Sequence, residues 1–179
     1  MSDFRRRLMS GAGPGGPKRY TITVYPSSLD TTLSVYDSID SAHPIENAFT
    51  ASSSSSYARV HWVYGNNEHT WIYLNFDLSQ IPLDATIISV SGTVRQAMTG
   101  TQATRWTVRE AALTSGTTIK SYVWTPSMNS ASTISDAGTW TAAELHEAKW
   151  MTHIQRRSYG TTEYHCDLYG LSLTVTYEI

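Results

Sequence analysis

The clearest alternation of hydrophobic and polar positions runs from Trp71 to Arg95. Apolar residues occupy every second position up to Leu78, the pattern breaks around Pro82, and it then resumes as far as Val94. A period of two is typical of a strand with one buried face, and proline cannot donate a hydrogen bond within a sheet. The stretch predicts a strand, a tight crossover and a second strand whose apolar faces meet in one core. These faces comprise Ile72, Leu74, Phe76 and Leu78, and then Ile88, Val90, Gly92 and Val94.

Shorter segments of the same kind flank this stretch, with turn residues between them. We expect strands over residues 20–25, 32–36, 57–64, 105–110, 118–124, 153–157 and 164–179. Between them we expect a turn at 26–30, a hairpin at 65–68 and a polar loop at 126–138. One helix is predicted, from Thr141 to Trp150, because Thr141 and Glu144 have the spacing of a capping box. The predicted fold is all-β: an antiparallel β-sandwich of jelly-roll type with one short helix late in the chain.

The first 18 residues differ from the rest and predict a flexible basic N-terminal anchor arm, followed by the sandwich domain over residues 19–179. Residues 1–19 carry a net charge of +4, so the remainder carries −6 within a total of −2. Residues 11–17 form a Gly/Pro linker. Apolar anchors beside arginines are common at interfaces, which makes the expected partner-binding residues Phe4, Arg5, Arg6, Arg7 and Leu8. Two alternatives are an ordinary frayed terminus and an arm that folds back on its own domain.

Composition narrows the classes of partner. A net charge of −2 disfavours a general nucleic-acid binder, and no apolar run has membrane-spanning length, so we expect neither nucleic acid nor membrane as a partner. The N-terminus lacks the apolar region of a secretory signal. The single cysteine, Cys166, excludes an internal disulfide and is expected to lie in a strand as a small apolar residue.

The six histidines do not show metal-ligand spacing, although His61 and His69 could face each other across the predicted hairpin. A structural calcium is a weaker alternative, because Asp37, Asp40 and Glu46 occupy one loop but have no EF-hand pattern. We therefore expect no metal and no cofactor.

Catalytic patterns are also weak. There is no nucleophile-elbow motif, and serines are too numerous for a Ser/His/Asp set to be informative. Glycoside hydrolysis is an alternative if Asp77, Glu110 and Glu163 converge on a sheet face. Few acids lie on predicted strands, so we expect the protein not to be an enzyme and assign no catalytic residue.

Aromatic residues are the stronger binding signal. Tyr57, Tyr64, Trp71 and Tyr73 fall on the more polar faces of neighbouring predicted strands, and we interpret them as a candidate aromatic contact face. Three interpretations are open: the face is covered by its own chain, it contacts another subunit of an oligomer, or it stacks against sugar rings.

The segment from Tyr73 to Val94, YLNFDLSQIPLDATIISVSGTV, resembles the strand–crossover–strand core of DNRLRE-type, carbohydrate-binding-module-like jelly rolls. The ending LYGLSLTVTYEI and the leader MSDFRRRLM are similar to those of bacteriophage virion proteins. The resemblance implies a non-enzymatic virion structural protein, either a head decoration or a tail or fibre component. It would be assembled in the host cytoplasm, form a homo-oligomer and contact other virion proteins. The alternative is a carbohydrate-binding host-attachment module whose partner is a surface glycan.

Overall fold

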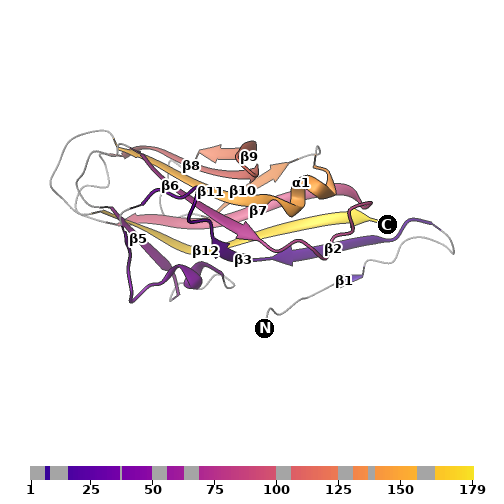
Figure 1. Cartoon of the computed structure of the whole chain (residues 1–179), viewed down its shortest axis with the longest axis horizontal. Coiled ribbons are helices and arrows are strands. Elements are labelled where there is room, and N and C mark those ends of the chain that lie inside the picture. The colour runs from indigo at the N-terminus through magenta and orange to yellow at the C-terminus, as the bar shows by residue number, and fades with distance from the viewer. Residues whose placement is uncertain are drawn as a thin grey trace.

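The computed structural model describes residues 7–8, 16–36, 38–49, 56–62, 69–99, 106–124, 131–136, 140–156 and 164–179. Two antiparallel sheets lie face to face along the long axis of the molecule (Figure 1). One sheet has seven strands: β1 (Arg7–Leu8), β2 (Arg19–Val24), β4 (Ser38–Ile39), β5 (Ala58–Trp62), β7 (Thr86–Thr99), β10 (Ala131–Asp136) and β12 (Tyr164–Glu178). The other has five, in the order β3 (Pro26–Leu29), β6 (His69–Phe76), β11 (Ala148–Arg156), β8 (Trp106–Ser115) and β9 (Thr118–Trp124).

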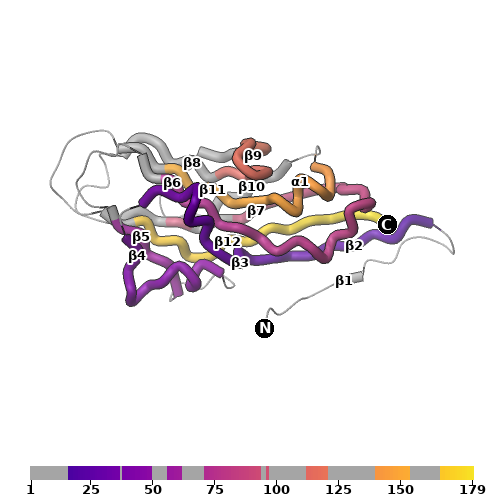
Figure 2. The backbone as a smooth tube through the Cα atoms, in the orientation of Figure 1, coloured from indigo at the N-terminus to yellow at the C-terminus, as the bar shows by residue number. Residues whose placement is uncertain are grey.

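Strand β12 organises the seven-stranded sheet. It pairs with β7 over nearly its whole length on one side, and with β5 and then β2 on the other. From β5 to β8, and again from β10 to β12, consecutive strands belong to different sheets. The tube in Figure 2 shows one of these crossings, from β6 to β7, along residues that the structure describes. Such alternation is the winding of a jelly roll, so the predicted fold class is confirmed.

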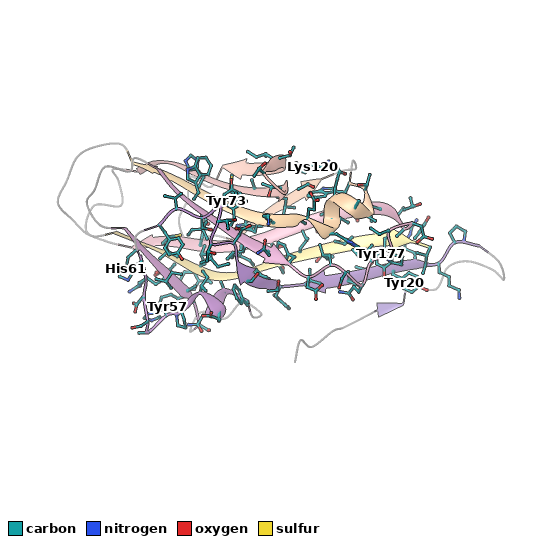
Figure 3. All side chains as sticks on the ribbon, viewed as in Figure 1. Tyr20, Tyr57, His61, Tyr73, Lys120 and Tyr177 are labelled. Carbon is teal, nitrogen blue, oxygen red and sulfur yellow. The ribbon has the colours of Figure 1, made fainter. Side chains whose placement is uncertain are left out.

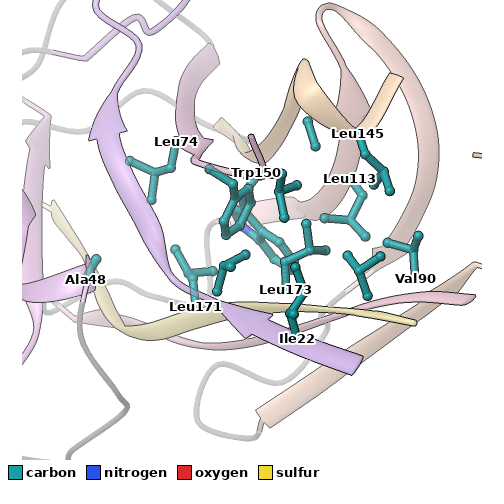
Figure 4. Close-up of a cluster of buried hydrophobic side chains, with 14 of the residues drawn as sticks. Ile22, Ala48, Leu74, Val90, Leu113, Leu145, Trp150, Leu171 and Leu173 are labelled. Carbon is teal, nitrogen blue, oxygen red and sulfur yellow. The ribbon is translucent and has the colours of Figure 1, made fainter. Parts of the chain in front are cut away.

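The core is built from the alternating inward positions of both sheets (Figure 4). Trp150 of β11 is fully buried near its centre, and Leu74 of β6 and Leu173 of β12 are also fully buried. The first predicted strand therefore has the expected register, since Ile72, Leu74, Phe76 and Leu78 are all buried. Cys166 is buried in β12, as expected.

The second predicted strand departs from simple alternation at one point. The ladder between β7 and β12 shifts register between Thr176 and Tyr177, where Tyr177 pairs with Ile87 and Thr176 with Ser89. Ile88 is the extra residue of this bulge and is 37% exposed, whereas Ile87 packs against the core. The prediction that Ile88 faces the core was wrong because a bulge reverses the alternation on one side of it.

The predicted helix is shorter than expected. Helix α1 covers Ala142–His146, and its capping box forms as predicted, with Thr141 and Glu144 each accepting from the other's backbone N–H. The chain then enters β11 at Ala148 instead of continuing as helix to Trp150. A ten-residue helix has little stability of its own, and β11 forms ladders with β6 on one side and β8 on the other.

Several other boundaries were wrong for the same non-local reason. Residues 26–29 form a strand instead of a turn, because β3 pairs with the edge of β6, whereas the expected strand over 32–36 is reduced to one bridge between Val35 and Trp71. Residues 131–136, expected to be loop, pair with β7 as β10. The η1 turn of 3₁₀-helix, Ile45–Phe49, follows the short strand β4.

Within the N-terminal arm the structure describes residues 16–18 and Arg7–Leu8, and Arg7–Leu8 form β1. This strand pairs with β2, with Arg7 opposite Thr21 and Leu8 opposite Tyr20, at the edge of the seven-stranded sheet. Phe4, Arg5 and Arg6 lie outside the described residues. The expected boundary after residue 18 stays a prediction. Strand β2 begins at Arg19, and Lys18 already exchanges backbone hydrogen bonds with Ile179 at 2.8 and 3.1 Å.

Candidate functional site

The predicted aromatic face is divided between the two sheets. Trp71 and Tyr73 lie in β6 of the five-stranded sheet, whereas Tyr57 directly precedes β5 of the seven-stranded sheet. Tyr64 lies outside the described residues. The expected hairpin joining these strands was wrong, because β5 and β6 belong to different sheets. The four residues therefore do not form one continuous face.

Tyr57 belongs to a compact cluster on the seven-stranded sheet (Figure 3). Its ring stacks on His43 with centroids 4.3 Å apart, and the Tyr169 ring lies 5.2 Å away. The guanidinium of Arg59 also lies 5.2 Å from the Tyr57 centroid. These contacts favour the interpretation that Tyr57 is covered by its own chain.

The charges beneath this cluster are paired. Arg59 donates to both carboxylate oxygens of Asp167, from Nε at 2.7 Å and Nη2 at 2.9 Å, and the Asp167 side chain is 1% exposed. The hydrogen bonds to Asp167 raise the pKa of Arg59 above its ordinary value. The hydrogen bond with His43 Nδ1, at 3.0 Å, holds the pKa of Asp40 below its usual range. This part of the sheet is held together by paired ions, a structural role.

The candidate metal sites do not assemble among the residues that the structure describes. His61 lies in β5 and His69 in β6, on different sheets, so the two residues do not lie across one hairpin. Asp37 lies outside the described residues, and no group of three or more His, Cys, Asp or Glu in the described ranges is arranged to hold a metal ion.

The alternative of converging carboxylates is disfavoured by the backbone positions of the two acids that can be followed. Asp77 follows β6 and accepts from the backbone N–H and hydroxyl of Ser79 in a local turn. Glu110 of β8 lies opposite His153 of β11, and His153 lies opposite Trp71 of β6. Trp71 comes six residues before Asp77 in the chain. At the rise of a strand this separation is roughly 20 Å, well beyond the distance between the carboxylates of a glycosidase. Glu163 lies outside the described residues.

The outer face of the five-stranded sheet carries the second group of aromatics. Trp71 and His153 lie opposite each other on β6 and β11, and their rings stack with centroids 3.6 Å apart and an interplanar angle of 5°. His153 is 7% exposed and Trp71 is half-buried. Both positions face away from the central core, because their neighbours Ile72 and Thr152 point inward.

The next row on this face is equally well packed. Met151 of β11 lies opposite Tyr73 of β6 on one side and Ala112 of β8 on the other. Met151 and Ala112 are fully buried but do not belong to the central core cluster. They form a small apolar layer on the outer face of the sheet, beside the stacked Trp71–His153 pair.

The third row on this face contains one ion pair and one hydrogen bond to an amide. Lys149 donates to Asp30 at 2.9 Å and to Asn75 at 2.7 Å. Hydrogen bonds from Thr32, and then from Lys149, lower the pKa of Asp30 strongly. Asp30 is thus held as an anion that fixes the segment after β3 against the sheet.

Register places three further positions beside Trp71 that sequence reasoning did not include in the candidate aromatic contact face. His153 lies opposite Glu110 in β8, and Glu110 lies opposite Trp124 in β9. Trp71, His153, Glu110 and Trp124 therefore occupy one cross-strand row, which we call the Trp71–Trp124 row. The alternation within each strand was visible in the sequence, but the partner of each strand was not, so this row was not predicted.

Comparison with known proteins gives little further information. No family model matches the chain, and no curated protein matches it. One solved structure, a Podospora anserina GH26-CBM35 beta-(1,4)-mannanase, aligns with 87% of this chain and 27% of its own, at 14% identity and a TM-score of 0.36. The chain thus spans about a quarter of the length of that enzyme. At this TM-score the likeness carries no argument about fold or function.

Among the described residues, no helix is both long and apolar enough to cross a membrane.

Proposed function

We propose that this chain is a non-enzymatic structural protein of a bacteriophage virion, docked to its assembly by the N-terminal arm. The observation behind the arm's role is that its described strand, β1, pairs at a sheet edge with β2 of its own chain, so in the isolated chain this part of the arm folds back on its own domain. Edge pairing uses backbone hydrogen bonds, which a strand can form equally with its own sheet or with that of a neighbour. The similarity of the leader and the closing strands to virion proteins supports the assignment to a virion.

The sandwich itself is suited to a rigid building block. Its longest strand, β12, extends over Tyr164–Glu178 and bridges β7 to both β2 and β5. The first residue of β2, Arg19, lies opposite Glu178 at the end of β12 and donates to its carboxylate from Nε at 2.9 Å. The start of β2 is thereby fixed where the arm leaves the domain, and the arm can bind a partner without disturbing the core.

Deletion of residues 1–10 tests the role of the arm. The truncated protein should melt within a few degrees of the full chain, because β1 contributes only two paired residues, but it should no longer be incorporated into particles. The matched control replaces Arg5, Arg6 and Arg7 with lysine, which keeps the charge and the apolar anchors. Particles that contain normal amounts of the truncated protein would show that the arm is an ordinary terminus.

A second candidate function is a carbohydrate-binding host-attachment module. The observation that favours it is the outer face of the five-stranded sheet, where half-buried Trp71 stacks on His153 beside Tyr73. Aromatic side chains on an outer sheet face can stack against the apolar faces of sugar rings. The two functions are compatible, because the arm and this face belong to different sheets.

A further inference from the structure

Strand β2 lies near the edge of the seven-stranded sheet and receives a further strand there. On one side it pairs with β12 over all six of its residues. On its other side, among the strands that the structure describes, it pairs with β1, and only at Tyr20 and Thr21 (Figure 1). The outer edge of β2 thus accepts an added antiparallel strand, and in the isolated chain the occupant is its own arm.

This edge is held in place by the rest of the sandwich. The inward side chains of β2 belong to the core and are those of Tyr20, Ile22 and Val24. On the outward face the hydroxyls of Thr21 and Thr176 lie 3.0 Å apart, as do those of Thr23 and Thr174. Because β2 is already ordered, an added strand binds at the entropic cost of ordering the arm alone.

The connection between β1 and β2 is long enough to serve a second domain. Nine residues separate Leu8 from Lys18, of which four are glycine and two are proline. Hairpin loops that fix the register of their strands usually have about two to five residues. A nine-residue connection reaches roughly 30 Å when extended, which is sufficient to bring β1 to the β2 edge of an adjacent copy.

Pairing of β1 with its own β2 and with the β2 of a second copy uses the same residues. The backbone hydrogen bonds are identical in the two arrangements, so local concentration decides between them. A tether of this length presents the arm to its own domain at an effective concentration on the order of millimolar. Copies that are packed side by side in an assembly present their edges to one another at a concentration at least as high.

Charge makes a second copy a suitable partner. Residues 1–19 carry a net charge of +4, whereas the remainder of the chain carries −6. An arm that reaches a neighbouring copy therefore meets the same acidic domain as it does on its own chain. The existing ladder joins only two residue pairs, Arg7 with Thr21 and Leu8 with Tyr20, so few hydrogen bonds must break for the exchange.

We propose that, in the assembled protein, β1 of each copy pairs with the outer edge of β2 of a neighbouring copy. The exchange joins the copies through backbone hydrogen bonds that each chain also forms alone. The inference rests on the proposed docking by the arm and names its partner as a second copy of this chain.

Disulfide formation between two single variants, tagged to differ in mass, distinguishes exchange from pairing within one chain. In a mixture of Arg7→Cys and Thr21→Cys the opposed thiols lie on different chains, so a mixed disulfide reports exchange. Opposite residues of an antiparallel pair have Cα atoms about 4.5–5.5 Å apart, which a disulfide can span. Under mild oxidation the mixture should form the mixed dimer at about 1 mM and lose it on dilution to about 1 µM.

Three controls accompany the mixture. Ser89 is exposed and lies in one row with Thr176, Thr21 and Arg7, but about 14 Å from Arg7, so Ser89→Cys should form no mixed disulfide with Arg7→Cys. The double variant Arg7→Cys, Thr21→Cys should close within one chain at about 1 µM. The unaltered chain should not cross-link, because Cys166 is 1% exposed.

The proposal is overturned if, at about 1 mM, Arg7→Cys forms no more mixed dimer with Thr21→Cys than with Ser89→Cys. It is also overturned if the double variant remains a closed monomer at both concentrations. Particles that exclude the protein lacking residues 1–10, combined with no mixed disulfide, would retain the arm as an anchor and assign it to a different virion protein. Particles that contain normal amounts of the truncated protein would refute docking by the arm whatever the cross-link shows, so the two failures are distinguishable.

Discussion

Gly92→Ala should destabilise the sandwich because of one close approach between the two sheets. Gly92 lies in β7, and a Cβ at this position would be 2.8 Å from Cζ3 of Trp150 and 3.3 Å from both Cδ atoms of Leu113. Trp150 belongs to the opposite sheet, is fully buried, and donates from Nε1 to Thr152 at 3.1 Å. The indole can therefore move away only by breaking this hydrogen bond or displacing its neighbours.

Two opposing effects set the size of the change. Overpacking a well-filled core costs about 1–3 kcal/mol. Replacing glycine with alanine in a strand returns roughly 0.5–1 kcal/mol, because the unfolded chain loses conformational freedom. The steric term is larger, since the contact is with a rigid ring and not with the end of a flexible side chain. We expect Gly92→Ala to lower the free energy of unfolding by about 1–2 kcal/mol.

Urea denaturation followed by far-UV circular dichroism measures this change. Ser91→Ala, at the adjacent outward position of β7, is the matched control and should change the free energy of unfolding by less than about 0.5 kcal/mol. In a Trp150→Phe background the Gly92→Ala cost should shrink, because the clashing ring is smaller. The reasoning is refuted if Gly92→Ala is as stable as the unaltered chain, or if its cost is the same in both backgrounds.

Two further predictions concern the core and acid stability. Leu74→Ala should lower the free energy of unfolding by about 2–5 kcal/mol, because Leu74 is fully buried. Leu83→Ala, at a 69% exposed position, is the control and should have little effect in the same denaturation assay. Equal stabilities of the two variants would refute the register of β6. The hydrogen bond from Lys120 lowers the pKa of Glu144 from 4.5 to about 2, so the ionised side chain stabilises the fold above pH 4.5 and this contribution is lost as the pH falls towards 2. The stability difference between the unaltered chain and Glu144→Gln should therefore be largest above pH 4.5 and vanish near pH 2, with Glu46→Gln as an exposed control; a gap independent of pH would contradict the pairing.

Local sequence determined most of the strands and one helix terminus of this protein. Alternation from Leu171 to Tyr177 is sufficient to define the inward face of β12, because side chains of a strand point to opposite faces in turn. The capping box of Thr141 and Glu144 was equally visible, since its hydrogen bonds join residues three apart. Both signals depend only on near neighbours in the chain.

Strand pairing was decided by the tertiary structure alone. Residues 131–136 look like loop in isolation and become β10 because β7 has a free edge, and the helix that starts at Ala142 ends early because β11 is required between β6 and β8. The bulge that exposes Ile88 arises from the ladder with β12, and the alternation of residues around Ile88 does not predict it. Such contacts join residues far apart in the chain, so their energies depend on the whole arrangement of strands.

The candidate site shows the same division. The sequence places Trp71 and Tyr73 on the outer face of their strand, because their neighbours are the apolar residues of the core. Only the register of β11 against β6 and β8 brings His153 and Glu110 into line with Trp71, and only the assignment of β5 to the other sheet separates Tyr57 from them. A strand's own period fixes which face a residue takes, whereas the residues beside it on that face are fixed by long-range pairing.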